Sequence, residues 1–174
     1  MIHTASELQI MEKYNESIDS EIYDYVKKIY NGEKVPSITV GFLSDKAARK
    51  IEELTGKKVY GNRVILDDNG IIHIKKRHGE NGEHDESMKN IEDIARIGYI
   101  LANYDCIEFR NEYAQGYVDA NGKLAPKVII SKKIDGTFYV IEAVSDAKKH
   151  KNYIVSAYIK IRKTESDSSV PNNA

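Results

Sequence analysis

The sequence predicts an α+β domain built on an antiparallel β-sheet. Apolar residues recur at helical spacing in several segments of the first two thirds of the chain, which predicts helices there. The last third instead alternates between apolar and polar residues, as strands with one buried face do. Two of these alternating segments flank Asp135-Gly136, a dipeptide that is typical of a β-hairpin turn.

The composition is that of a soluble protein with a single domain. A chain of 174 residues is long enough to bury its own core, and 41% hydrophobic with 30% charged residues is an ordinary balance. No apolar run reaches the roughly 20 residues of a membrane helix, and no signal peptide is recognisable. Cys106 is the single cysteine, which rules out an internal disulfide and fits a reducing compartment. We therefore expect a cytoplasmic protein that does not act at a membrane.

The first part of the chain predicts two helices with a short strand between them. Residues 1–34 form an acidic, amphipathic helical stretch that ends at Asn31-Gly32. This stretch is expected to be an N-terminal extension, a helical layer on the domain, or the tail of a larger parent protein. A strand is expected over residues 35–42. Ser44 is a suitable N-cap for the second helix, and Gly56 a suitable end.

The middle of the chain predicts a brief strand, a turn and two more helices. An apolar run over residues 64–66 is followed by Asp67-Asp68-Asn69-Gly70, which predicts a turn. A short helix is expected next and is closed by Gly79. After a polar loop, apolar residues over 91–102 fall largely on one face, which predicts one continuous helix.

The remaining strands are expected over residues 105–109, 127–132, 137–144 and 152–162. Cys106, in the first of them, is expected to be a small buried residue rather than a nucleophile. In the last strand, the odd positions from Tyr153 to Ile161 predict one apolar face, and the even positions from Ser156 to Arg162 a polar and basic face. The tail over residues 164–174 is small and polar and is expected to be disordered.

The segment from His73 to Gly79 is the strongest chemical signal in the sequence. It combines two histidines with Lys75, Lys76 and Arg77, so it offers groups that exchange protons near neutral pH and cations that can hold a phosphate. On a helix, His73 and Arg77 share a face, whereas His78 lies about 140° away from His73. His78 therefore aligns with the apolar face and is either a catalytic imidazole aimed across the sheet or a packed histidine at the helix end.

The last strand offers a complementary surface. A hydroxyl, a phenol and two cations follow one another on its polar face at intervals of about 6–7 Å. Such a row could bind a nucleotide, with Tyr158 stacked on a base. A local excess of Lys and Arg over residues 146–163 favours phosphate binding, although the net charge of the whole chain is −1. The alternative is an ordinary solvent-facing sheet surface. The residues in this row are Ser156, Tyr158, Lys160 and Arg162.

Other chemistries have less support. His73, His78 and His84, with Asp85 or Glu86, could ligate a metal, but their spacing fits no familiar ligand pattern. The sequence contains none of the motifs of P-loop, dinucleotide-binding, serine-hydrolase or zincin sites. We therefore predict a site without a metal or another cofactor.

Several short segments of the sequence occur in a recognisable order. They are Val40-Gly41-Phe42-Leu43-Ser44, Leu54-Thr55-Gly56, Val64-Ile65-Leu66, the segment from Ile72 to Gly79, Glu86-Ser87, Ile91-Glu92-Asp93-Ile94, Ile100-Leu101-Ala102-Asn103, the Asp135-Gly136 hairpin and the segment from Val155 to Lys160. Together they resemble the phage-type barnase–EndoU–colicin–RelE-like (BECR) nucleases, toxin-like domains of phage and mobile-element polyvalent proteins. The resemblance covers about residues 35–163.

The resemblance implies an α+β fold with helices packed on one face of an antiparallel sheet, and it implies cleavage of RNA. Together with the helical stretch before it and the polar tail after it, this predicts an N-terminal helical extension (1–34), a nuclease domain (35–163) and a disordered tail (164–174). It also implies that the helix with two histidines and the Ser-x-Tyr strand carry the active site. The catalytic residues it implies are His73, His78, Ser156 and Tyr158.

The first functional hypothesis is a toxin-like, metal-independent endoribonuclease acting in the cytoplasm of a bacterial host. One imidazole would activate the ribose 2′-OH, and an acid would protonate the leaving oxygen. RNA is the expected substrate, and an immunity or antitoxin protein is a candidate partner. The alternatives are a non-catalytic module that binds nucleic acid or protein, and a structural component of a phage particle. The residues expected to bind substrate are Lys76, Arg77, Lys160 and Arg162.

Overall fold

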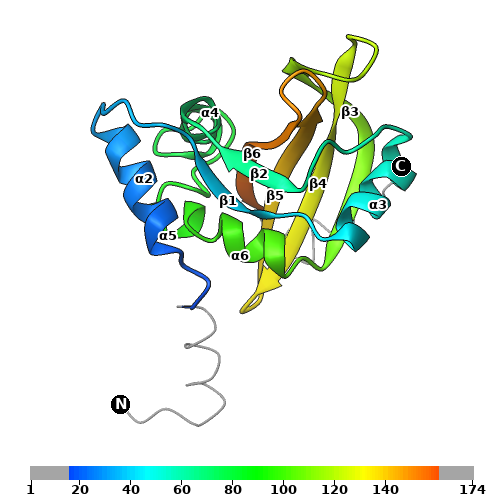
Figure 1. Cartoon of the computed structure of the whole chain (residues 1–174). Helices are drawn as coiled ribbons and strands as arrows, with labels where there is room; N and C mark the ends of the chain where they lie inside the picture. The colour runs from blue at the N-terminus through cyan, green and yellow to red at the C-terminus, as the bar shows by residue number, and fades with distance from the viewer. Residues whose placement is uncertain (1–15, 161–174) are drawn as a thin grey trace.

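The protein folds as a six-stranded sheet with helices beside it. A computed structural model describes residues 16–160 (Figure 1). The strands are ordered β1-β2-β6-β5-β4-β3 across the sheet. The elements are α2 (Ser20–Tyr30), β1 (Ile38–Phe42), α3 (Asp45–Thr55), β2 (Arg63–Leu66), α4 (Asp68–His78), α5 (Ile91–Ile94), α6 (Ile97–Ala102), β3 (Cys106–Val118), β4 (Leu124–Ile134), β5 (Thr137–Asp146) and β6 (Lys151–Lys160).

The predicted α+β class is confirmed, with one difference in the sheet. Four of the strand pairings are antiparallel, as predicted, whereas β2 and β6 run parallel over a short stretch. The chain leaves β2 through α4 and returns only as the last strand, and this long connection permits a parallel pair. The hairpin between β4 and β5 turns at Asp135 and Gly136, which both have positive φ, as this turn requires. None of the described helices is long and apolar enough to cross a membrane.

Helix ends follow the capping signals of the sequence in most places. The Ser44 hydroxyl accepts a hydrogen bond from the Ala47 amide and starts α3, and Gly56 ends it in the left-handed conformation. The predicted turn at residues 67–70 is instead the first turn of α4. Asp67 acts as its N-cap and accepts a hydrogen bond from the Gly70 amide, so residues typical of turns here begin a helix.

The single helix predicted over residues 91–102 is two short helices, α5 and α6. They are separated at Ala95 and Arg96, which keep a helical φ but have ψ near 0°. The Arg96 side chain turns inwards and pairs with Asp93, and it is almost completely buried. Apolar periodicity alone contains no sign of this buried ion pair and therefore predicts a continuous helix.

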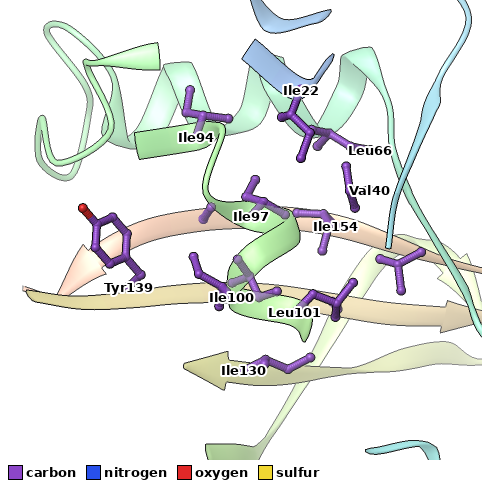
Figure 2. Packing of buried hydrophobic residues seen from close by; sticks show 14 of the residues in the cluster. Ile22, Val40, Leu66, Ile94, Ile97, Ile100, Leu101, Ile130, Tyr139 and Ile154 are labelled. Carbon is purple, nitrogen blue, oxygen red and sulfur yellow. The ribbon is translucent and has the colours of Figure 1, made fainter. Parts of the chain in front are cut away.

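Most of the core lies between the helices and one face of the sheet. Ile97, Ile100 and Leu101 of α6 project onto β4, β5 and β6, where Ile130 and Ile154 meet them (Figure 2). Ile22, Tyr25 and Val26 of α2 are buried in the same core. Of the three possibilities for the N-terminal helix, a helical layer on the domain therefore describes α2. The predicted tail over residues 164–174 lies outside the described residues.

The opposite face of the sheet, on which α6 does not pack, carries a smaller apolar cluster. Tyr153 and Val155 belong to this smaller cluster, whereas Ala157 belongs to the main core. This corrects the prediction that Tyr153, Val155 and Ala157 share one face. The cause is a register shift against β5 that leaves Val155 without a partner and reverses the alternation beyond it. Ile161, also assigned to that face, lies outside the described residues.

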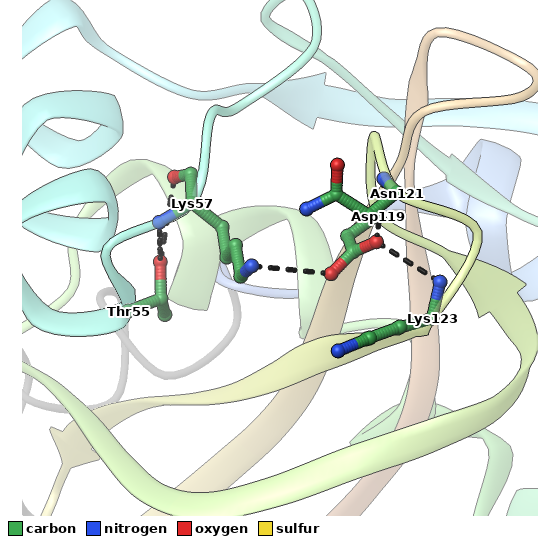
Figure 3. Close-up of polar contacts among 5 residues, drawn as sticks. All are labelled: Thr55, Lys57, Asp119, Asn121 and Lys123. Atoms are coloured by element: carbon green, nitrogen blue, oxygen red, sulfur yellow. Dashed lines mark hydrogen bonds and ion pairs between the residues drawn. The ribbon is translucent and has the colours of Figure 1, made fainter.

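Cys106 is exposed, which corrects the prediction that it is buried. It starts β3, an edge strand, and its neighbour Ile107 takes the inward position. The other end of β3 is tied by Asp119 to the segment that follows α3. Its carboxylate pairs with Lys57 at 3.3 Å and accepts hydrogen bonds from the amides of Asn121 and Lys123 (Figure 3).

Gly70 sets how closely α4 approaches β6. A Cβ at this position would lie 2.7 Å from the Ile154 carbonyl oxygen, which is shorter than a van der Waals contact. Gly70→Ala is therefore expected to destabilise the protein by about 1–3 kcal/mol, because the steric clash outweighs the better helix propensity of alanine. Urea denaturation measures this loss. Ile72→Ala, in the same helix at a position that is 55% exposed, is the control and should change stability by no more than about 0.5 kcal/mol.

Candidate functional site

A cavity of about 340 Å³ lies between α4, the loop that follows it and the sheet face opposite α6. Ser156 and Glu142 are direct cross-strand neighbours on this face, and Tyr158 follows on the same side of β6. The helix contributes both histidines of its motif. The residues that line the cavity are His73, Arg77, His78, His84, Glu112, Lys127, Glu142, Ser156 and Tyr158.

The length of β2 explains why a helix can reach this place. β2 pairs with β6 only near the beginning of β6, so the rest of that edge is open to α4. The loop after α4 completes the cover, because the Ser87 hydroxyl accepts a hydrogen bond from the Ile159 amide. The Met88 amide donates to the carbonyl of His78, which holds the loop against the helix end. α4 thus directs one side to the main core and another to the cavity.

His78 is a buried imidazole with a fixed orientation. Its Nδ1 lies 2.9 Å from Asp85 Oδ1, and its ring stacks on Tyr158 with 5.0 Å between centroids. Burial raises the pKa of Asp85, but the hydrogen bonds from Ser87 and His78 outweigh it and hold the pKa below its usual value. With Asp85 ionised, its carboxylate accepts a hydrogen bond from Nδ1–H, and Nε2 is the ring nitrogen left for proton exchange. His78 is therefore packed at the helix end and also lines the cavity, and a catalytic role for it stays a prediction.

His73 differs from His78 in its electrostatic surroundings. Partial desolvation, and next the positive charge of Arg77, lower the pKa of His73 below the usual 6.5, although Glu142 acts in the opposite direction. The imidazole is therefore neutral at pH 7 and able to accept a proton. Burial and nearby Glu142 raise the pKa of Tyr158, so its phenol is a neutral hydrogen-bond donor.

The cations of the cavity are not equivalent. Lys127 lies 3.2 Å from a carboxylate oxygen of Glu142 and 3.9 Å from one of Glu112, so its charge is shared. Within residues 16–160, no carboxylate forms an ion pair with Arg77. A guanidinium without a carboxylate partner is suited to bind phosphate through two parallel hydrogen bonds.

The structure brings five of the eight predicted site residues together. His73, His78, Ser156, Tyr158 and Arg77 all line the cavity. The other three are expected substrate-binding residues. Lys76 and Lys160 are exposed and do not line it, and Arg162 lies outside the described residues.

Sequence reasoning missed three charged residues that line the cavity. Glu112, Lys127 and Glu142 come from three different strands, and only strand register brings them to one place. The sequence suggests His84 and Asp85 only as possible metal ligands, whereas His84 lines the cavity and Asp85 contacts His78. The signal for the Asp85 contact is its position seven residues after His78, in a loop that folds back on the helix. Among the described residues, no three His, Cys, Asp or Glu side chains are grouped as metal ligands would be.

An α+β domain with three imidazoles, a guanidinium and two hydroxyls around one cavity offers groups that can exchange protons and bind a phosphate. The family described as phage-Barnase-EndoU-ColicinE5/D-RelE like nuclease3 matches residues 41–167, which is most of the chain. The chain belongs to this family, and the resemblance found in the sequence is confirmed. No curated protein and no solved structure matches the chain.

Proposed function

We propose that this nuclease is a metal-independent endoribonuclease that cleaves RNA by attack of the ribose 2′-OH. His73 acts as the general base and takes the 2′-OH proton, and the 2′-oxygen then bonds to phosphorus. The bond from phosphorus to the 5′-oxygen breaks, and His78 donates a proton to that leaving oxygen. The products are a 2′,3′-cyclic phosphate and a 5′-hydroxyl. Arg77 stabilises the charge that develops on the phosphate.

One observation supports this proposal more than the others: His73 and His78 line one cavity and have different surroundings. His73 is neutral at pH 7 because burial and Arg77 lower its pKa, which suits a base. His78 has its Nδ1 in contact with the carboxylate of Asp85 at 2.9 Å, which orients the ring and leaves Nε2 as the nitrogen that could protonate the leaving oxygen. Two titratable groups in different surroundings are candidates for separate base and acid roles. A toxin-like role in a bacterial cell, restrained by an immunity or antitoxin protein, is part of the same proposal.

Incubation of the protein with end-labelled RNA in EDTA tests the proposal. We expect cleavage in the chelator and fragments that end in a 2′,3′-cyclic phosphate, because no step needs a metal ion. RNA in which every 2′-OH is methylated is the control and should stay intact, since it lacks the nucleophile. Absence of cleavage, or cleavage that returns only with added metal, would contradict the mechanism. RNA binding without any cleavage would favour a non-catalytic binding module.

The pH dependence of cleavage should report the low pKa of His73. As pH falls through that pKa, the base becomes protonated and kcat/KM decreases, so the acidic limb should have its midpoint below pH 6.5. Arg77→Gln removes a positive charge that lowers this pKa, and it should therefore shift the midpoint to higher pH. The measurement is kcat/KM against pH for both proteins. A midpoint that does not move would show that Arg77 does not act on the base.

A further inference from the structure

A second cavity, of about 450 Å³, continues the first one along the same sheet face. His73, Lys127 and Glu142 line both cavities and form the boundary between them. The proposed general base therefore stands between two spaces, whereas His78 and Tyr158 line only the first. A bound chain of nucleotides could extend to both sides of the reacting phosphate.

The far part of the second cavity offers aromatic rings and polar side chains. Tyr113 is 49% exposed, so its ring is open to a ligand. Tyr117 lies against Tyr153 with 5.2 Å between ring centroids. Burial, followed by the charge of Asp67, raises the pKa of Tyr117 to about 12, so its phenol stays neutral. Lys149 and Asn69 also line this cavity and add a cation and an amide. Neutral rings beside a cation and an amide can bind a nucleobase and an adjoining phosphate.

We propose that the second cavity binds the nucleoside on the 5′ side of the cleaved phosphate, with its base against Tyr117 and Tyr113. This inference rests on the proposed function, and it assigns both a subsite and a direction to the RNA chain. The base that is held here is the one attached to the ribose whose 2′-OH reacts.

The direction follows from the positions of the two histidines. The 2′-OH belongs to the nucleoside on the 5′ side of the phosphate, and the leaving 5′-oxygen belongs to the nucleoside on the 3′ side. In an in-line displacement these oxygens lie on opposite sides of phosphorus. His73, the base, lines the second cavity, and His78, the acid, lines only the first. The 5′-side nucleoside therefore lies in the second cavity and the leaving nucleoside in the first.

Two mononucleotides test the proposal through binding rather than cleavage. Adenosine 3′-monophosphate reproduces the 5′-side nucleoside with its phosphate, and adenosine 5′-monophosphate reproduces the leaving side. Tyr117→Ala and Tyr113→Ala should each weaken binding of the 3′-monophosphate about fivefold or more, since stacking on a base is lost. Binding of the 5′-monophosphate should change by less than about twofold. Isothermal titration calorimetry measures both affinities.

Three further variants make the result specific. Tyr117→Phe keeps the ring and should bind the 3′-monophosphate as the wild type does. Tyr60→Ala, outside both cavities, is the matched control and should leave both affinities unchanged. Arg77→Gln should weaken the binding of both mononucleotides, because each carries a phosphate. If Tyr117→Ala and Tyr113→Ala bind the 3′-monophosphate as tightly as the wild type does, the proposed subsite is overturned. If these variants lose affinity for the 5′-monophosphate alone, the RNA chain runs in the opposite direction. Since these outcomes do not depend on cleavage, they are separate from a failure of the ribonuclease proposal.

Discussion

Replacement of His73 by asparagine is expected to lower kcat/KM for RNA cleavage by about 10²–10⁴-fold, the usual contribution of a general base. Asparagine keeps polar atoms near the place of the ring but cannot accept a proton at neutral pH. His73 lies in the middle of α4, away from the Asp85 contact that holds His78, so the substitution should leave the fold intact. The measurement is single-turnover cleavage of a short labelled RNA, with circular dichroism as the check on folding.

His150→Asn is the matched control for this substitution. His150 lies outside both cavities and has φ of 55°, a conformation that asparagine tolerates well. It should retain the activity of the wild type. Glu142→Gln tests whether Glu142 is the general base instead of His73, since this carboxylate lines the same cavity. If His73→Asn keeps its cleavage activity and Glu142→Gln loses it, the base is Glu142 and our mechanism is contradicted.

Replacement of Arg96 by methionine is expected to destabilise the protein by about 3–5 kcal/mol, the cost of leaving a buried charge without its partner. Arg96 is 2% exposed, and its guanidinium donates hydrogen bonds to Asp93 and to the Ser17 hydroxyl. The Tyr139 hydroxyl donates to the same Asp93 oxygen at 2.8 Å. This network joins the segment before α2, the break between α5 and α6, and strand β5. The free energy of unfolding in urea is the measurement.

A double substitution shows whether the unpaired charge causes this loss. Arg96→Met with Asp93→Asn removes both charges, and it should be more stable than Arg96→Met alone, because no carboxylate remains buried without a cation. Tyr139→Phe removes one hydrogen bond and should cost about 1 kcal/mol. A loss below about 1 kcal/mol for Arg96→Met would contradict the network as a main source of stability.

Much of the local structure could be predicted because the signals are short in range. The Ser44 cap and the Gly56 end of α3 depend on hydrogen bonds and backbone angles within a few residues. The turn at Asp135 and Gly136 depends on the φ values of two residues. The break between α5 and α6 could not be predicted, since it depends on a side chain that turns into the core. The bulge at Val155 was missed for a related reason, because a strand pattern does not show how its partner is registered.

The candidate site likewise has a part that could be predicted from the sequence and a part that could not. The chemistry of His73, His78, Ser156 and Tyr158 was visible in the sequence, because residue type and helical or strand spacing are local properties. Helical geometry separated the two histidines in angle, and the structure shows that both nevertheless line one cavity. The open edge of β6 allows this, since α4 lies along the edge and can present side chains to the core and to the opposite sheet face.

The sequence by itself determined the α+β class, the family and the two segments that carry the candidate chemistry, because periodicity, capping residues and motif order are properties of the linear chain. Only the tertiary structure decided which partners those segments meet. It placed Asp85 on His78, brought Glu142 and Lys127 in from separate strands, and left Lys76 and Lys160 outside the cavity. The physical reason is that electrostatic environment depends on distances through space, and strand register and loop packing set those distances.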